Sequence, residues 1–329
     1  MITKIFDNGW GPEYPIKKFE QQIVNELLTN ELTDSSKTVV INSVWYTADY
    51  HQQVLADLRT MEFDKIVLVA MLDAAIPKPE WFDEFGCAVL AVGYYPEPNT
   101  LDFWALFVDQ YFDHPKVSVL ADHTQMTVPY MCLNRKPHWH RVRLYNQLTE
   151  LELVSKGLVS MGGQGQAIKL LDTDCEHDSL APNATRDQTG LPNDIASIGH
   201  LSNWQQSFLN VVTETVYNIN QNHFVSEKIF KPIVGLRPFL VYDTDGASTW
   251  LTAQGFQPYT ADFKDISDLD LTIPENLAPF LKTLCEQPQS YFQEKFVALM
   301  PKLLYNRNQF NTYVATQTNK IEKGLKCQT

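Results

Sequence analysis

Phe224-Val-Ser-Glu-Lys-Ile-Phe-Lys-Pro-Ile233, followed by the strand-like run Pro238-Phe-Leu-Val-Tyr242, is the stretch around which the rest of the chain is organised. Ser226 suits the N-cap of a helix, and Glu227 then falls in the first turn, where the helix dipole favours an acid. Lys228 follows at the N-terminus of the helix, where free backbone N–H groups can bind an anion such as phosphate. An ordinary capped helix with a solvated Glu-Lys pair is the alternative interpretation.

Short apolar runs alternate with helical spacing in the first part of the chain. The pattern predicts buried strands at Lys37–Trp45, Lys65–Met71, Gly86–Val92 and Lys116–Leu120, and helices at Pro15–Asn30, Asp49–Met61 and Leu101–Phe112. Near-continuous apolar strands that alternate with helices indicate a parallel sheet covered on both faces. We therefore expect an α/β, Rossmann-like first domain in residues 1–124, after a polar opening.

The same alternation continues over residues 125–329, which we expect to form a second α/β domain. Strands are predicted at Val128–Leu133, Gly157–Met161, Phe208–Thr215 and Pro238–Tyr242, and helices after Arg143 (with Leu144, Leu148, Leu151 and Leu153) and over Ala247–Gln254, Pro274–Glu286 and Gln289–Lys320. Residues 162–203 are rich in Gly, Asp, Asn, Thr and Pro and predict a long surface excursion. A chain of 329 residues is also longer than one hydrophobic core usually holds.

Charge and cysteine content exclude several classes of protein. The formal net charge of −13 disfavours a nucleic-acid-binding protein, because such binding depends on neutralising phosphates. The five cysteines are scattered and form no C-x-x-C pair, which is typical of a reducing compartment. No apolar run approaches the ~18 residues of a membrane span, and the first residues do not have the shape of a signal peptide. We expect a cytoplasmic protein without a transmembrane segment.

Basic residues are concentrated between a predicted strand and the following helix. The group consists of Arg135, Lys136, His138, His140, Arg141 and Arg143. In an acidic chain such a group can focus positive potential on a diphosphate, and arginine offers bidentate contacts. The alternative is a solvated basic turn paired with Glu150 and Glu152. Ligands of doubly wound sheets bind beyond the carboxyl ends of the strands, where this turn, Glu214 and the Glu227-Lys228 pair are all expected.

The histidines of this turn allow a metal site as an alternative. His138 and His140 could join Cys132, Cys175 or His177 as ligands. Histidines two residues apart point the same way only on a strand, whereas Pro137 and the helical pattern that follows predict a loop, so we expect no bound metal. Phosphate loops of the GxxxxGK[ST] type, G-x-G-x-x-G fingerprints and G-x-S-x-G elbows are absent, which disfavours the common kinase, dehydrogenase and hydrolase classes.

Three segments occur in an order that resembles a known family. They read Arg141-Val-Arg-Leu-Tyr-Asn-Gln-Leu148, Val212-Thr-Glu-Thr215 and Phe224-Val-Ser-Glu-Lys228. Residues 130–256 thereby resemble the donor-binding domain of GT-B glycosyltransferases, most closely the α1,3-fucosyltransferase family, with its R-x-x-apolar-Y-x-x-L, F-E-N and Y-V-T-E-K motifs. The resemblance implies two Rossmann-like domains facing a cleft, with C-terminal helices packing back toward the first domain.

The resemblance also implies an activity. It is the transfer of a sugar, fucose in the family, from a nucleotide-diphosphate sugar such as a GDP-linked donor to a hydroxyl of a glycan or other acceptor, with inversion and without a metal or other cofactor. In this alignment Arg141 contacts the diphosphate, Glu214 and Glu227 the sugar or ribose, and Lys228 a phosphate. Thr215 replaces the family's Asn and Phe224 its Tyr, so the base and sugar of the donor stay open. The expected donor-binding set is Arg135, Arg141, Glu214, Thr215, Phe224, Ser226, Glu227 and Lys228.

Catalysis would need charge stabilisation and a base. Arg141 and Lys228 would stabilise the departing diphosphate, and Glu227 the positive charge that grows at the anomeric carbon. The base would come from the first domain, where Asp49, His51, Asp73 and Glu80 are available and where Asp49 and Asp73 closely follow strands. A sugar-nucleotide-binding protein without turnover and a metal-dependent hydrolase are the alternatives. The resemblance to the fucosyltransferase family also allows an acceptor at the inner face of the membrane.

Overall fold

The computed structural model describes residues 2–8, 19, 21–23, 25, 37–43, 48–70, 79–93, 100–111, 122–134, 137–161, 198, 201–215, 217, 225–243 and 246–322. The chain divides into two compact units, unit 1 with Met1–Phe107 and Val314–Thr329, and unit 2 with Val108–Tyr313. Residue 124, where we placed a domain boundary, falls inside unit 2. The strand expected at 116–120 lies outside the described residues.

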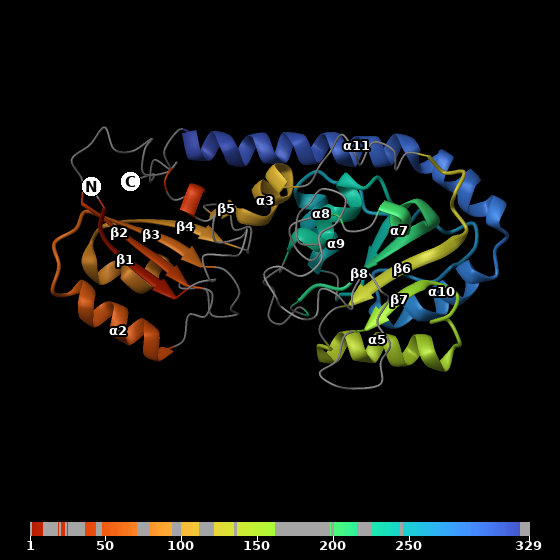
Figure 1. Cartoon of the computed structure of the whole chain (residues 1–329), viewed down its shortest axis with the longest axis horizontal. Coiled ribbons are helices and arrows are strands. Elements are labelled where there is room, and N and C mark those ends of the chain that lie inside the picture. The colour runs from red at the N-terminus through yellow and green to blue at the C-terminus, as the bar shows by residue number, and fades with distance from the viewer. Residues whose placement is uncertain are drawn as a thin grey trace. The chain divides into compact units, whose positions relative to one another are not determined.

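Unit 1 contains a five-stranded parallel sheet with strand order β1-β2-β3-β4-β5 (Figure 1). Its elements are β1 (Ile2–Asn8), β2 (Thr38–Ser43), α2 (Ala48–Leu58), β3 (Lys65–Ala70), η1 (Pro79–Phe85), β4 (Ala88–Gly93), β5 (Thr100–Asp102) and the first part of α3 (Phe103–Tyr111), which continues into unit 2. In the core, Ile41 and Leu68 of the central strands are buried together with Val54 and Leu58 of α2. The apolar runs therefore predicted these central strands and the helix that covers them.

Two strands of unit 1 were not predicted. The opening residues, for which the sequence pattern predicts only a polar segment and no strand, form β1, a strand at the edge of the sheet. Phe6 in β1 is buried whereas its neighbour Ile5 is 53% exposed, so the strand needs an apolar residue only at every second position. β5 runs directly into α3 and has only three residues, and a strand of this length is too short to be detected by its periodicity.

Unit 2 contains a four-stranded parallel sheet with strand order β7-β6-β8-β9. Its elements are β6 (Val128–Asn134), α5 (Trp139–Glu150), β7 (Leu158–Met161), α7 (Leu201–Gln206), β8 (Ser207–Val212), α8 (Glu227–Val234), β9 (Phe239–Val241), α9 (Gly246–Ala253), η3 (Pro274–Asn276), α10 (Leu277–Cys285) and α11 (Gln289–Glu322), whose residues from Val314 onward belong to unit 1. The α/β class with parallel sheets is thereby confirmed for the described residues.

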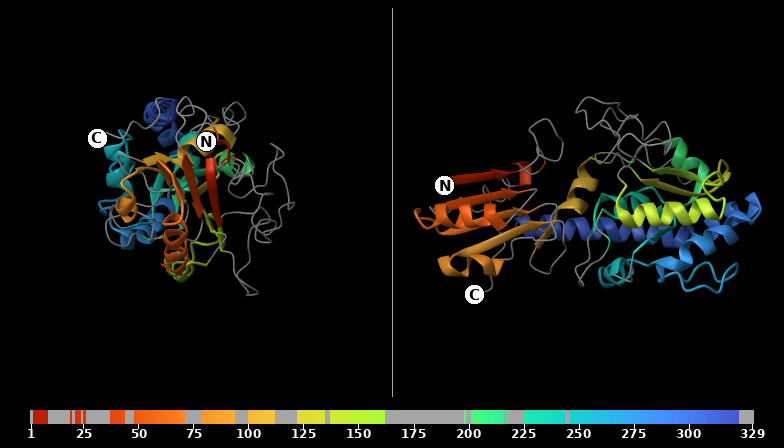
Figure 2. Two further views of the ribbon diagram at one scale, coloured as in Figure 1. Left: turned by 90° about the vertical axis from the view of Figure 1, so that its left-hand side faces the viewer. Right: turned by 90° about the horizontal axis from the view of Figure 1, so that it is seen from below.

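The strand order of unit 2 creates a topological switch point. β7 follows β6 in the sequence and lies on one side of it, whereas β8 lies on the other side. Figure 1 shows α5, which follows β6, below the sheet and α8, which follows β8, above it, and the same elements are seen from below in Figure 2. The connections after β6 and β8 therefore diverge to opposite faces. Ligands of open α/β sheets bind in the crevice that such a divergence leaves.

Some boundaries in unit 2 differ from those expected. α5 begins at Trp139, so the second half of the basic segment is helical and not a loop. Pro137 is compatible with this start because it precedes the N-cap His138, where no helix hydrogen bond is interrupted. β8 ends at Val212, which places Glu214 beyond the strand. α7 was not expected within the predicted excursion, most of which lies outside the described residues.

Candidate functional site

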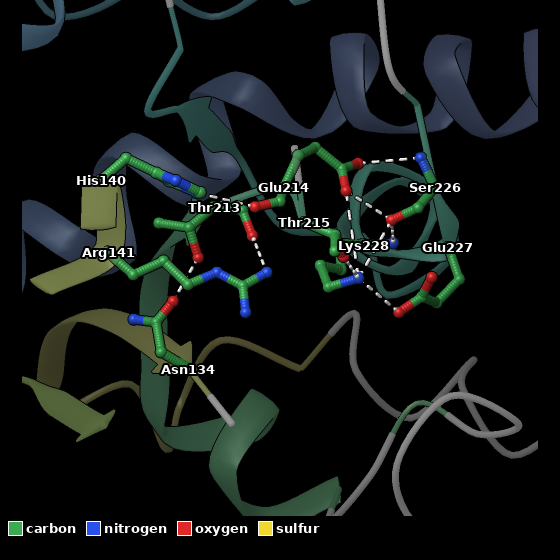
Figure 3. A network of polar contacts seen from close by, with 9 residues as sticks. All are labelled: Asn134, His140, Arg141, Thr213, Glu214, Thr215, Ser226, Glu227 and Lys228. Atoms are coloured by element: carbon green, nitrogen blue, oxygen red, sulfur yellow. Dashed lines mark hydrogen bonds and ion pairs between the residues drawn. The ribbon is translucent and has the colours of Figure 1, made fainter. Parts of the chain in front are cut away.

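A polar network lies at the carboxyl ends of β6 and β8, at the switch point of unit 2 (Figure 3). Asn134 is the last residue of β6, and Thr213 follows the last residue of β8. The Thr213 hydroxyl donates a short hydrogen bond to Oδ1 of Asn134, and both side chains are buried. This bond joins the ends of the two strands whose connections diverge.

Glu214 ties the end of β8 to the start of α8. Its Oε1 accepts a hydrogen bond from the backbone N–H of Ser226 at 2.9 Å, and its Oε2 accepts one from the Ser226 hydroxyl at 2.5 Å. Ser226 is the N-cap of α8, as expected, and its Oγ in turn accepts from the backbone N–H of Lys228. The N-cap Ser226 is thus bonded both to Glu214, after β8, and to the first turn of α8.

Lys228 is the cation at the centre of this network. Its Nζ lies 2.9 Å from Oε1 of Glu227, 3.2 Å from Oγ1 of Thr215, 3.2 Å from Oγ of Ser226 and 4.0 Å from Oε2 of Glu214. The two glutamate side chains are 2% exposed, whereas that of Lys228 is 29% exposed. The ammonium group is therefore held in place by oxygens of the network, and the Lys228 side chain is still partly exposed, which allows it to meet an anionic ligand.

The two buried carboxylates have different protonation preferences. Burial raises the pKa of Glu214, an effect only partly offset by the Lys228 charge and reinforced by the Glu227 charge. Burial also acts on Glu227, but the charges of Lys228 and Lys231 and the hydrogen bond from Lys228 outweigh it, and the pKa of Glu227 is lowered. Oε2 of Glu227 is buried and has no hydrogen-bond partner among the described residues. Carboxyl groups with pKa values pushed apart can take different roles in one site.

The first turn of α5 is attached to the same strand end through backbone carbonyls. Nη2 of Arg141 donates to the Thr213 carbonyl at 2.9 Å, and Nε2 of His140 lies 2.9 Å from the Glu214 carbonyl. Burial is the main cause that lowers the pKa of His140 to about 4, so the ring is neutral near pH 7. Because a carbonyl only accepts, Nε2 carries the proton. Nδ1 is then a buried acceptor without a partner in the described part of the chain.

The structure brings most of the expected donor-binding residues together. Arg141, Glu214, Thr215, Ser226, Glu227 and Lys228 belong to one connected network (Figure 3). Arg135, Phe224 and Asp73 lie outside the described residues. Asp49 lies in the first turn of α2 in unit 1 and is exposed, whereas the residues of this network belong to unit 2.

Sequence reasoning missed the residues that position the network. Asn134 is the last residue of β6 and Thr213 follows the last residue of the neighbouring strand β8, and this position at the strand ends is the signal that could have singled them out. His140 was considered as a metal ligand, and its bond to a backbone carbonyl from a segment 74 residues away has no local signature. The alternative interpretation of the basic segment is a solvated turn whose side chains pair with Glu150 and Glu152. Arg143 instead pairs with Glu275 at 3.0 Å, between two largely exposed side chains.

The described residues of this site do not form a cluster of metal ligands. Within the described ranges, no group of three or more His, Cys, Asp or Glu side chains is placed to hold a metal ion. The rings of His138 and His140 are stacked with centroids 6.0 Å apart, and Cys175 and His177 fall outside those ranges. Among the helices that the structure describes, none combines the length and apolar character needed to cross a bilayer.

Comparison of the chain with protein-family models, with curated protein sequences and with solved structures gives no match. A function is therefore inferred from the geometry of the network and from the order of the sequence motifs that form it.

Proposed function

We propose that the chain is a glycosyltransferase that moves a sugar from a nucleotide-diphosphate sugar to an acceptor hydroxyl, with inversion and without a metal, and that unit 2 binds the donor. The observation that carries this proposal is the placement of Lys228, with Glu214 and Glu227, at the carboxyl ends of β6 and β8. Ligands of parallel sheets bind at such a switch point, and a helix N-terminus with a fixed ammonium group suits a phosphate.

Lys228 would stabilise the departing nucleoside diphosphate. Negative charge develops on the phosphate oxygens as the bond to the sugar breaks, and a cation already held in position needs no reorganisation to meet it. The contacts of Nζ with Glu227, Thr215 and Ser226 supply that positioning. Partial exposure of the Lys228 side chain leaves room for a phosphate oxygen.

Glu227 and Arg141 would have separate roles. Oε2 of Glu227 is an ionised acceptor without a donor in the described part of the site, and a hydroxyl of the donor sugar or ribose would satisfy it. Arg141 donates to the Thr213 carbonyl through Nη2, and because a guanidinium has five N–H donors this bond is compatible with a contact to the diphosphate. Its role in this geometry is to fix α5 on the end of β8.

The base that deprotonates the acceptor is proposed to come from unit 1. Asp49 remains a candidate because it lies near the carboxyl end of β2 and is exposed, and Asp73 remains the other candidate from the sequence. Either carboxylate would need to come within hydrogen-bond reach of the acceptor hydroxyl.

A donor-binding protein without turnover is the second candidate. It is favoured by the internal bonds of Glu214 and Arg141, which engage both side chains within the protein. Both candidates predict donor binding. Only the transferase predicts release of nucleoside diphosphate when a hydroxyl acceptor is added.

The test is a thermal-shift titration with GDP, UDP, ADP, CMP and their sugar conjugates, with and without EDTA. A ligand at a hundred times its dissociation constant adds about 2.7 kcal/mol to the free energy of unfolding. We expect stabilisation by one nucleoside diphosphate and its sugar conjugate, insensitive to EDTA, and its loss in Lys228→Ala. Lys302→Ala is the matched control, because Nζ of Lys302 also forms an ion pair, 2.6 Å from Asp262, outside the network. Absence of stabilisation by every nucleotide would refute the proposal.

A further inference from the structure

Trp139 is a large apolar side chain that the fold leaves exposed beside the candidate site. It is the first residue of α5 and is 58% exposed, whereas the next residue, His140, is buried and bonded to the Glu214 carbonyl. Most of an indole is buried when it serves only the core of a protein. Its position next to a network residue therefore indicates a role in binding.

The indole is supported by rings that are anchored in the protein. The Trp139 and Tyr217 centroids are 4.9 Å apart at an interplanar angle of 68°, and those of Trp139 and His140 are 5.6 Å apart at 81°. The centroid of the Tyr217 ring lies 5.2 Å from that of His140 and 5.9 Å from that of the buried Tyr242. A ring held in this way loses little conformational entropy when a ligand stacks on it.

The same short segment connects these rings with Lys228. Thr215 contacts Nζ of Lys228 at 3.2 Å, and Tyr217 lies two residues further along the chain, a separation of at most about 7 Å along the backbone. Figure 3 shows His140 and Lys228 on opposite sides of the segment that contains Thr213, Glu214 and Thr215. A ligand that crosses this strand end can thus meet an aromatic ring on one side and a cation on the other.

We propose that Trp139, supported by Tyr217 and His140, is the surface on which the nucleobase of the donor stacks. This inference rests on the proposed function and specifies which part of the donor binds at α5. A nucleotide carries a planar π-system and a phosphate in one molecule, which matches the ring and the ammonium group of this site. Base–aromatic stacking is tolerant of base identity, so Trp139 supplies affinity for the nucleoside rather than selection of one base.

The test is calorimetric titration of the full chain with GDP, UDP, ADP and CDP, and with inorganic pyrophosphate as a probe that has no base. In Trp139→Ala we expect the nucleoside diphosphate that binds best to bind about 5- to 100-fold more weakly, with pyrophosphate affinity unchanged. Trp139→Phe should stay within about threefold of the wild type because it keeps an aromatic face. Trp81→Ala is the matched control, since Trp81 is a partly exposed indole, 37% exposed, in unit 1.

The outcomes separate the two proposals. Nucleoside diphosphate affinity equal to that of the wild type in Trp139→Ala would overturn the stacking role and leave the donor site standing. An equal loss of pyrophosphate and nucleoside diphosphate affinity would also overturn it, because Trp139 would then act on the structure of the whole site. If the wild-type chain binds no nucleoside diphosphate, the proposed function and the stacking role are both overturned.

Discussion

At the scale of single residues, the two buried glutamates should respond differently to neutralisation. Glu214→Gln keeps an acceptor for the Ser226 N–H and resembles the neutral form that burial favours, so we expect the free energy of unfolding at pH 7 to change by less than about 1 kcal/mol. Glu227→Gln removes the charge 2.9 Å from the ammonium group of Lys228. That pair is partly screened because Lys228 is 29% exposed, and we expect a loss of about 1–2 kcal/mol.

Urea denaturation of both variants at pH 7 measures this difference. Glu275→Gln, which removes the exposed partner of Arg143, provides a control for the general effect of neutralising a glutamate. Equal losses in Glu214→Gln and Glu227→Gln would contradict the assignment of different protonation preferences to the two carboxyl groups.

His140 should make the fold sensitive to mild acid. Its pKa is about 4 in the folded chain and about 6.5 when unfolded, so the unfolded state binds more protons between these values. The free energy of unfolding therefore falls as the pH is lowered from 6.5 to 4, by up to about 3 kcal/mol from this residue. In His140→Gln we expect a shallower decline over that window, measured by urea denaturation at several pH values. His123→Gln is the control, and a decline equal to that of the wild type in His140→Gln would refute the prediction.

At the scale of elements, the sequence predicted what depends on local pattern. β2, β3, β6 and α11 were predicted because their apolar runs or helical spacing are long enough to be read without knowing their neighbours. The start of α5 was missed because Pro137 suggested a loop. The strands β1 and β5 were missed because an edge position or a length of three residues leaves little periodicity.

The candidate site shows the same division. Ser226 as N-cap, with Glu227 and Lys228 behind it, could be predicted because capping is a local property. The bonds of Asn134 with Thr213 and of His140 with the Glu214 carbonyl could not, since each joins segments more than 70 residues apart. The burial of Arg237 could not be predicted either, because no sequence pattern marks this residue, which is fully buried and donates to the carbonyls of Trp204, Ser207 and Leu236.

The end of α9 provides a test at this scale. Gly255 has a φ of +82°, its N–H donates to the Thr252 carbonyl, and the N–H of Phe256 donates to the Leu251 carbonyl. These two bonds form a Schellman motif, which favours glycine at this position. A Cβ at Gly255 would also lie 2.8 Å from the amide nitrogen of Gln309. In Gly255→Ala we expect the free energy of unfolding to fall by about 1–2 kcal/mol, measured by urea denaturation.

Gly86→Ala separates the two causes of that loss. Gly86 also has a positive φ, +58°, but an added Cβ would meet nothing within 4 Å. It should therefore show only the backbone strain, about 1 kcal/mol. A smaller loss in Gly255→Ala than in Gly86→Ala would contradict the role assigned to the helix end.

At the scale of the whole molecule, α11 contributes residues to both units. In unit 2, Lys295 and Lys302 form ion pairs with Asp265 and Asp262, and Asn306 donates hydrogen bonds to the Gln257 carbonyl and the Tyr259 hydroxyl. In unit 1, Gln317 is 3% exposed and its Oε1 accepts a hydrogen bond from the backbone N–H of Asp102. The last turns of this helix therefore help to hold a unit whose other residues lie more than two hundred positions earlier in the chain.

Hydrogen exchange measured by mass spectrometry can show whether that contribution is confined to unit 1. Gln317→Ala removes a buried acceptor, which costs about 1–3 kcal/mol, and we expect faster amide exchange in peptides that cover β5 and α3. Peptides that cover β6 and β8 should be unchanged, because Gln317 belongs to unit 1. Asn319→Ala, an exposed position two residues along the same helix, is the matched control and should leave both units as in the wild type. Faster exchange in β6 and β8 as well would mean that the two units unfold as one cooperative body, and the division into units would then not describe the stability of the chain.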